Sequence, residues 1–267
     1  MIAAKCWREM RLYALLYVVL LGGLLGLALL FWPDAREKLV EKGGQFEFLA
    51  PMQALKDFFK DAASRLEPAA FAAYVGVQQF FKGVNIVGVA CAVLMGCSTI
   101  AKERERGTFE LLASRPVSRG RILWSTTWVL ALILVVPVFA SSLLVLPYAR
   151  AQGYELPVGG LLQASLHSSL FVLLFLGLTL LGSVLLRTQV EVATAIGAFV
   201  ILQVGIYFVP VVQHGSLFRL TDYDVYRPMV PGNLDWTGFL LGTEVWLVLA
   251  VVGVWLLAFT LFRRRDL

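Results

Sequence analysis

The chain has 267 residues, of which 59% are hydrophobic and only 15% are charged, and its mean hydropathy is +0.77. A soluble domain carries about a quarter charged residues, so this composition excludes a soluble globular fold. The net charge of +5 is modest and the basic residues form no stripe interleaved with aromatics, which excludes a nucleic-acid-binding protein. The charges cluster between apolar runs of roughly 18–25 residues, long enough to span a bilayer as helices.

These runs predict an all-α membrane protein with six transmembrane helices in a single domain, residues 1–267. The six spans are expected at about residues 12–32, 83–101, 120–147, 161–186, 190–212 and 239–262. Basic residues precede the first run, as they do in a signal peptide. The run is about twenty residues long and no cleavage site follows it, so we expect it to be retained as a span.

The distribution of Lys and Arg orients the six spans, which place both termini on one side. Thirteen of the 23 basic residues fall on the side of the termini and ten on the other. Seven of these ten lie in the long first outer loop, 33–82, where seven acidic residues balance them. Long loops also cross largely regardless of charge. We therefore predict that both termini are cytoplasmic and that the chain is a multi-pass protein of the inner membrane.

Two of the outer segments and one turn carry local signals of order. Apolar residues recur at helical spacing over 51–66, which predicts a helix that serves either as a structural cover or as a contact for an extracytoplasmic partner. Thr188 and Glu191 match a capping box, so spans four and five should form a tight hairpin. The polar, aromatic and proline-broken stretch 221–236 predicts an ordered cap near an outer gate.

The connector 102–119, KERERGTFELLASRPVSR, is unusually charged for this chain. Its first residues must have emerged into water, and Gly107 is a natural helix break. Thr108 is a candidate N-cap, and Glu110 places an acid in the first turn that follows. Pro116 biases Arg115 away from helix, so a short helix of about two turns is expected between Gly107 and Pro116.

One face of this short helix is apolar and is formed by Phe109, Leu112 and Ala113. Two interpretations stay open: a helix resting on lipid headgroups, or a docking element for a groove on a cytoplasmic protein. The rim also carries Glu103, Glu105 and Glu110 among its basic residues. Acids gain nothing near an anionic leaflet, so the mixed signs favour a protein surface.

The stretch from Glu103 to Arg119 resembles the loop between spans two and three of ABC-2-type transporter permeases, which follows the pattern E-[KR]-E-x-G-[ST]-x-E-x-L-L-[AS]-[ST]-x-P-V-S-R. The ending FRRRDL resembles the common C-terminus of that family, F-x-R-R-D-L. The six-span layout with a long first outer loop also fits, especially the subgroup that contains the permease of the nitrous-oxide-reductase maturation transporter.

The resemblance implies that the connector is a coupling helix that docks on a nucleotide-binding subunit. Its implied docking residues are Glu105, Thr108, Phe109, Glu110, Leu112, Ala113, Arg115, Pro116 and Arg119. The segment 5–11 would be an elbow helix that contacts the same subunit. The implied partners are an ABC ATPase and a second permease, identical or related, with membrane lipids around them. ATP and Mg²⁺ would be bound by the ATPase, and no cofactor by this chain.

The absence of catalytic motifs supports a transport subunit over an enzyme. The sequence contains no G-x-x-x-x-G-K-[ST], so ATP-driven work needs a separate polypeptide. It also lacks H-E-x-x-H, G-x-S-x-G and G-x-G-x-x-G, and its three cysteines show neither disulfide nor metal-site spacing. Two other functions stay open: a mechanotransmission anchor acting on an extracytoplasmic partner, and a six-span channel or transporter without an ATPase.

Few polar groups lie inside the spans, and buried ionisable ones are candidates for function. His167 and Glu244 lie at similar depth and can meet near an outer gate, and Gln203 is a further candidate for a polar path. Hydrogen bonding between helices is the alternative for Gln203 and for Asn85. We expect small residues to allow close helix contact at Gly88, Gly96 and Gly177.

Overall fold

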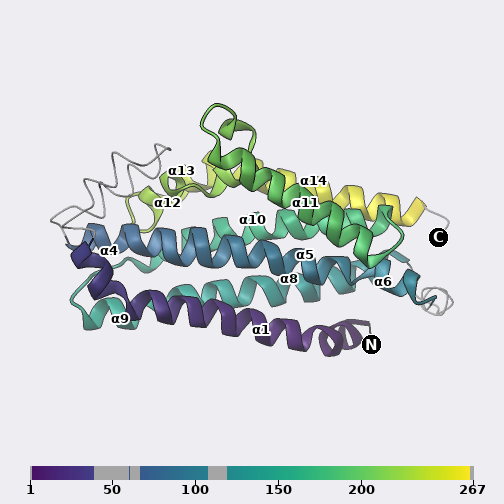
Figure 1. Cartoon of the computed structure of the whole chain (residues 1–267), viewed down its shortest axis with the longest axis horizontal. Helices are drawn as coiled ribbons and strands as arrows, with labels where there is room; N and C mark the ends of the chain where they lie inside the picture. Colours follow the sequence, from purple (N-terminus) through teal and green to yellow (C-terminus); the bar gives the residue numbers. More distant parts are fainter. Residues whose placement is uncertain (1, 39–59, 61–66, 108–118, 265–267) are drawn as a thin grey trace.

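The computed structural model describes residues 2–38, 60, 67–107 and 119–264, and in these residues it is a bundle of long helices without strands (Figure 1). Six of the described helices are long and apolar enough to cross a membrane: Ala3–Leu30, Pro68–Glu105, Gly120–Ala151, Val158–Leu185, Gln189–Phe208 and Val245–Arg264. The predicted all-α class and the six spans are confirmed.

Several spans are built from more than one helical element. The elements, in chain order, are α1 (Ile2–Leu30), α4 (Glu67–Val75), the π-helix η1 (Gly76–Val87), α5 (Gly88–Cys97), α6 (Ile100–Glu105), α8 (Arg119–Leu143), α9 (Val145–Ala151), α10 (Val158–Leu185) and α11 (Gln189–Phe208), followed by η2 (Gln213–Gly215), η3 (Leu217–Thr221), α12 (Tyr223–Met229), α13 (Trp236–Phe239), η4 (Leu240–Glu244) and α14 (Val245–Arg264). The four short elements η2, η3, α12 and α13 form the cap, which begins before the predicted stretch 221–236, and η4 is the kinked start of the sixth span.

The second span is longer than the sequence predicts. It begins at Glu67, inside the stretch expected to belong to the outer loop 33–82, because the residues that follow Pro68 are almost all apolar. Lys82, which suggested a boundary near residue 83, lies exposed on the surface of η1 and does not interrupt the helix. Of the amphipathic helix expected over 51–66, only Lys60 lies within the described residues.

Breaks in the other spans follow the local chemistry. Pro137 is accommodated inside α8, and Pro210 follows the end of α11. The sixth span was expected from about residue 239, but the chain kinks at Gly242, where the backbone angles are φ −80° and ψ −121°, and the regular helix α14 begins at Val245.

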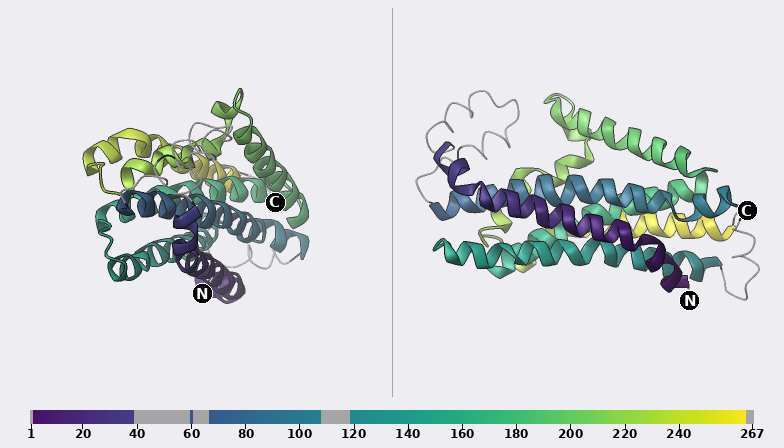
Figure 2. Two further views of the ribbon diagram at one scale, coloured as in Figure 1. Left: turned by 60° about the vertical axis from the view of Figure 1, so that its left-hand side comes forward. Right: turned by 60° about the horizontal axis from the view of Figure 1, so that its bottom comes forward.

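The helices run along one long axis, and both termini lie at one end, which we call the base (Figure 1). The opposite end, which we call the cap end, holds α4, α9, α12 and α13 (Figure 1). The α10 helix is central: 72% of its apolar window is buried, and it packs against α5, α8, α11 and α14. Toward its C-terminal end α11 leans away from the bundle in every view (Figures 1 and 2).

Glycines allow close contact between helices at three of the positions that the sequence suggested. A Cβ atom at Gly88 or Gly96 of α5 would lie 2.7 Å from Val172 Cγ2 or 2.8 Å from Thr179 Cγ2, respectively, on α10. A Cβ atom at Gly177 would lie 2.5 Å from a ring carbon of Trp255 on α14. The central helix α10 therefore packs closely against α5 and α14, and a residue larger than glycine at any of these three positions would clash with the neighbouring helix.

Candidate functional site

The base of the second span contains a break that separates α5 from α6. At Thr99 the backbone leaves helical geometry, with φ −82° and ψ −92°, so α6 starts with N–H groups that have no partner in the preceding turn. Ser183 of α10 supplies the missing acceptor: its Oγ accepts from the Ile100 N–H at 3.2 Å and from the Ala101 N–H at 2.9 Å. A side chain from another span thus caps α6.

The charges of α6 attach it to two other parts of the base. Lys5 Nζ on α1 lies 2.8 Å from Glu103 Oε1. Arg104 Nη1 donates to the Leu186 carbonyl at 2.7 Å, and Glu105 Oε2 accepts from the Gln189 N–H at 3.1 Å. The helix that leads into the connector is therefore bonded to the N-terminal helix and to the turn between α10 and α11.

The turn between α10 and α11 is itself ordered by the predicted capping box. Thr188 Oγ1 accepts from the Glu191 N–H at 3.1 Å, and the Glu191 carboxylate accepts from the Arg187 N–H at 2.9 Å. The signature S/T-x-x-E was enough to predict this geometry. The fixed turn gives the charges of α6 a rigid surface to bind.

Most of the predicted docking residues lie outside the described residues. Thr108, Phe109, Glu110, Leu112, Ala113, Arg115 and Pro116 are among these. Arg119 begins α8. Glu105 is placed by the structure, against the α10–α11 turn. The docking role of the set stays a prediction.

The cross-helix cap at Ser183 has a measurable consequence. Ser183→Ala leaves two buried N–H groups without an acceptor, and we expect it to lower the free energy of unfolding by about 1–3 kcal/mol. The matched control is Ser165→Ala on the same helix, because the Ser165 hydroxyl donates to Leu161 O within α10 and its loss leaves no N–H unpaired. Denaturant unfolding of the two purified variants, followed by tryptophan fluorescence, measures the difference. Equal stability of the two would contradict a cap at Ser183.

At the cap end, the structure brings together two of the three polar residues singled out in the spans. His167 Nδ1 lies 2.6 Å from Glu244 Oε1, and His167 Nε2 lies 2.6 Å from the Leu220 carbonyl oxygen. The two side chains are 0% and 2% exposed, so water does not solvate the pair. They come from α10 and from the kinked segment η4, and Leu220 belongs to the cap.

The carbonyl of Leu220 can only accept a hydrogen bond, so Nε2 of His167 must carry a hydrogen. The other ring nitrogen then either donates to an ionised Glu244 or accepts from a protonated one. In both cases the pair holds one shared proton and has no net charge. A neutral pair is the arrangement that a buried site tolerates.

A second polar cluster adjoins this pair and is centred on Tyr226 of α12. Its hydroxyl accepts from Asn85 Nδ2 at 2.7 Å and shares a hydrogen bond of 2.7 Å with Ser168 Oγ. The Tyr226 ring stacks on Phe80 at 5.4 Å and meets the His167 ring edge-on at 5.7 Å. One cap residue thus bonds to both the second and the fourth span, and burial raises the pKa of its hydroxyl.

Gln203 forms its hydrogen bonds with residues of the cap rather than with another span. Its Oε1 accepts from the Leu217 N–H at 2.7 Å, and its carbonyl accepts from Ser216 Oγ at 2.7 Å. Nearby, the Tyr207 hydroxyl donates to Asp222 Oδ1 at 2.9 Å. Burial raises the pKa of the Asp222 carboxyl, while the hydrogen bonds from Tyr207 and from the backbone act in the opposite direction.

These contacts join the cap to three spans, the second, the fourth and the fifth, through buried polar groups. The sequence indicated the cap, but it did not indicate that Asn85, Ser168 and Tyr226 meet, because their separation along the chain carries no signal of contact. Asn85 was expected to form a hydrogen bond between helices, and it does so with Tyr226 on the cap helix α12. The run Ser168-Ser169, beside a histidine in an apolar helix, was the available hint.

The described residues offer no obvious site for a metal or a covalent cofactor. No three His, Cys, Asp or Glu side chains gather in the part of the chain that the structure describes. Cys6, Cys91 and Cys97 are free thiols. The polar groups described at the base and at the cap form hydrogen bonds that join helices.

Comparison with known families identifies the family to which this chain belongs. A search of the curated proteins found no match to the chain. The model of the family described as ABC-2 family transporter protein matches residues 5–267, which is nearly the whole chain and includes all six spans. The match agrees with the six apolar helices and with the charged segment between the second and third spans. The chain belongs to the ABC-2 family of transporter proteins and is a multi-pass membrane protein.

Proposed function

We propose that this chain is the membrane-spanning subunit of an ATP-driven exporter whose ATPase is a separate polypeptide. The observation that carries the proposal is the attachment of α6 at the base, where its charged residues bond to α1 and to the α10–α11 turn. The sequence has no Walker A loop, so a transporter of this family needs an external source of energy. ATP and Mg²⁺ bind to that partner.

The contacts at the base explain how a movement of the connector would reach the spans. The break at Ser98–Thr99 separates α6 from the closely packed α5, so α6 can shift without unpacking the second span. Arg104 and Glu105 transfer such a shift to the turn that joins the fourth and fifth spans. Lys5 transfers it to the first span. The energy of ATP hydrolysis thus acts on three spans through one short helix.

Two permeases are needed to enclose a path, and α11 is one of the described helices that could meet a second copy. It is little buried within the chain: Ile201 is 74% exposed and Leu202 is 59% exposed. A second copy, or a related permease, gives the twelve spans of the complete transporter. The excess of Lys and Arg at the base supports an orientation in which that end, with both termini, faces the cytoplasm and the chain lies in the inner membrane.

The docking assignment predicts the behaviour of a double variant, Phe109→Ala/Leu112→Ala. Truncating both apolar side chains removes most of the predicted apolar face of the coupling segment, and we expect at least a tenfold loss of affinity for the partner ABC ATPase. Co-purification of the tagged permease with the ATPase, together with the ATPase rate in vesicles, measures the effect.

The matched control is Val211→Ala/Leu241→Ala, which truncates two exposed apolar residues (87% and 73% exposed) that precede and follow the cap. The control should retain the ATPase. If the Phe109→Ala/Leu112→Ala variant also retains the ATPase with an unchanged rate, the docking assignment is wrong. Transport that proceeds after ATP depletion would overturn the ATP-driven function as well.

A further inference from the structure

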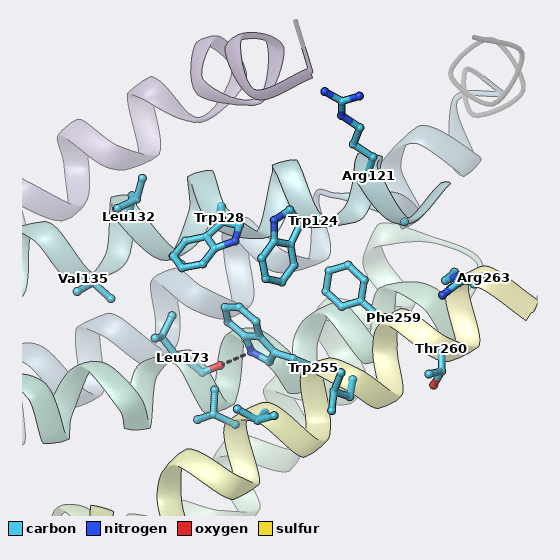
Figure 3. A pocket seen from close by; sticks show the side chains of 15 residues that line it. Arg121, Trp124, Trp128, Leu132, Val135, Leu173, Trp255, Phe259, Thr260 and Arg263 are labelled. Carbon is cyan, nitrogen blue, oxygen red and sulfur yellow. Dashed lines mark hydrogen bonds between the residues drawn. The ribbon is translucent and has the colours of Figure 1, made fainter. Parts of the chain in front are cut away.

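An open groove of about 1140 Å³ runs along the surface of the bundle between α8 and α14 (Figure 3). None of the contacts described at the base or at the cap uses it. Its walls come from the third and sixth spans, and Leu173 of α10 contributes to the floor. The groove opens to the side of the bundle, between two helices long and apolar enough to cross a membrane, and it is lined almost entirely by apolar side chains.

Aromatic rings form its walls. Trp124 and Trp128, one turn apart on α8, meet edge-to-face with ring centroids 5.5 Å apart, and Trp124 meets Phe259 of α14 at 5.6 Å. Trp255 lies opposite them, and its Nε1 donates to the Leu173 carbonyl at 3.1 Å, which fixes its ring (Figure 3). The indole N–H groups of Trp124 and Trp128 have no hydrogen-bond partner among the described residues, and both rings are about half exposed.

The base end of the groove is positively charged. Arg121 of α8 and Arg263 of α14 both line it, and both are exposed. In Figure 3 the two side chains extend in different directions from this end of the groove, and that of Arg121 points away from the aromatic walls. The two helices are close here, since a Cβ atom at Gly120 would lie 3.8 Å from Arg263 Cδ. No acidic side chain in the described part of the chain pairs with either arginine. Among the described residues, these two guanidinium groups at the base end of the groove therefore have no counter-ion.

The length of the groove matches one leaflet of a bilayer. From Arg121 to Val135, its limits on α8, the helix rises about 21 Å at about 1.5 Å per residue. Half of a hydrocarbon core of about 30 Å is about 15 Å. The apolar part of the groove thus reaches from the base interface to about the bilayer midplane, and the arginines lie at headgroup level.

We propose that this groove binds one anionic phospholipid from the leaflet on the base side. Arg121 and Arg263 hold the phosphate, as basic pockets between spans hold acidic headgroups. An acyl chain lies between the rings of Trp128 and Trp255. The free indole N–H groups lie at the depth of the ester oxygens, where tryptophan is favoured at membrane interfaces.

Charge favours this occupant over a second copy of the chain. A dimer axis along the membrane normal brings residues of equal depth together. Joining two such grooves would therefore gather four unpaired guanidinium groups, and like charges in one interface are unfavourable. An anionic lipid neutralises two of them instead. The inference goes beyond the proposed function, because the site needs no ATPase.

The test uses the full chain, purified without any ATPase and reconstituted in nanodiscs of equal parts phosphatidylglycerol and phosphatidylcholine. After extraction into detergent, native mass spectrometry counts the lipids retained per chain. We expect the wild type to retain one phosphatidylglycerol with a preference of about tenfold over phosphatidylcholine. Arg121→Gln/Arg263→Gln should reduce this preference to about twofold or less.

Two further variants keep the test specific. Arg8→Gln/Arg264→Gln removes the same charge from the same end of the molecule, outside the groove, and should keep the preference. Leu256→Trp adds bulk at a lining position that is 59% exposed, so it should fold normally and retain neither lipid.

Equal retention of the two lipids by the wild type, or an unchanged preference in Arg121→Gln/Arg263→Gln, would overturn the proposal. A shift from dimer to monomer in Leu256→Trp, with retained lipid unchanged, would assign the groove to a second copy and overturn it too. None of these outcomes bears on coupling to an ATPase, which Phe109→Ala/Leu112→Ala tests separately.

Discussion

Glu244→Leu should lower the free energy of unfolding by about 3 kcal/mol or more, whereas Glu244→Gln should lower it by only about 1 kcal/mol. The leucine removes the partner of His167 Nδ1 at a site where neither side chain is solvated, and it leaves that ring nitrogen buried without a hydrogen bond. The glutamine amide can still donate to Nδ1 of a neutral histidine. Unfolding by a denaturing detergent, followed by tryptophan fluorescence, gives both values.

Glu155→Leu is the matched control, because Glu155 is an exposed acid near the cap end with no partner among the described residues. We expect this control to change stability by no more than about 0.5 kcal/mol. If Glu244→Leu behaves like Glu155→Leu, the pair does not hold the cap. Substituting leucine at both His167 and Glu244 should recover part of the loss, because replacing a whole buried pair costs less than orphaning one member.

The pair joins three separate parts of the chain at the cap end. His167 lies on the central helix, Glu244 on the kinked start of the sixth span and Leu220 in the cap. Tyr226 adds bonds from the cap to the second and fourth spans. Any outward opening near the cap end must therefore break buried hydrogen bonds or carry the cap with the helices to which it is bonded.

The six spans could be predicted from the sequence because membrane insertion depends on one property, the length of an apolar run. The capping box at Thr188 could be predicted for a similar reason, since all its groups lie within four residues. The start of the second span could not be predicted from charge alone, because a single lysine on a helix surface resembles a boundary. The surrounding residues 67–81 were apolar enough to show the helix.

Contacts between distant segments were predictable only where chemistry restricted the choice. His167 and Glu244 were the clearest ionisable candidates within the spans, so depth alone suggested that they meet. The cap on α6 involves a serine 82 residues from Ala101, and serines are too common in this chain for one to be selected. The groove arises from the packing of α8 against α14, and neither helix carries a pattern that indicates its neighbour.

Gly177→Ala should lower the free energy of unfolding by about 2 kcal/mol, although alanine is the better helix former. The added methyl would lie 2.5 Å from Trp255 Cδ1 and 3.1 Å from Val254 Cγ1. Trp255 cannot turn aside freely, because its indole N–H is bonded to the Leu173 carbonyl on α10 itself. The α10–α14 contact must therefore separate or the hydrogen bond must break, and thermal unfolding in detergent will report the cost.

Gly253→Ala tests the same change on α14 where a Cβ atom meets nothing within 4 Å. There the substitution should raise the free energy of unfolding by up to about 1 kcal/mol, because it only reduces the freedom of the unfolded chain and favours the helix. Because the two substitutions should change the free energy of unfolding in opposite directions, their comparison separates the effect of packing from that of helix propensity. If Gly177→Ala is as stable as Gly253→Ala, the fourth and sixth spans are not in close contact at Trp255. The wall of the groove that Trp255 forms would then lie elsewhere.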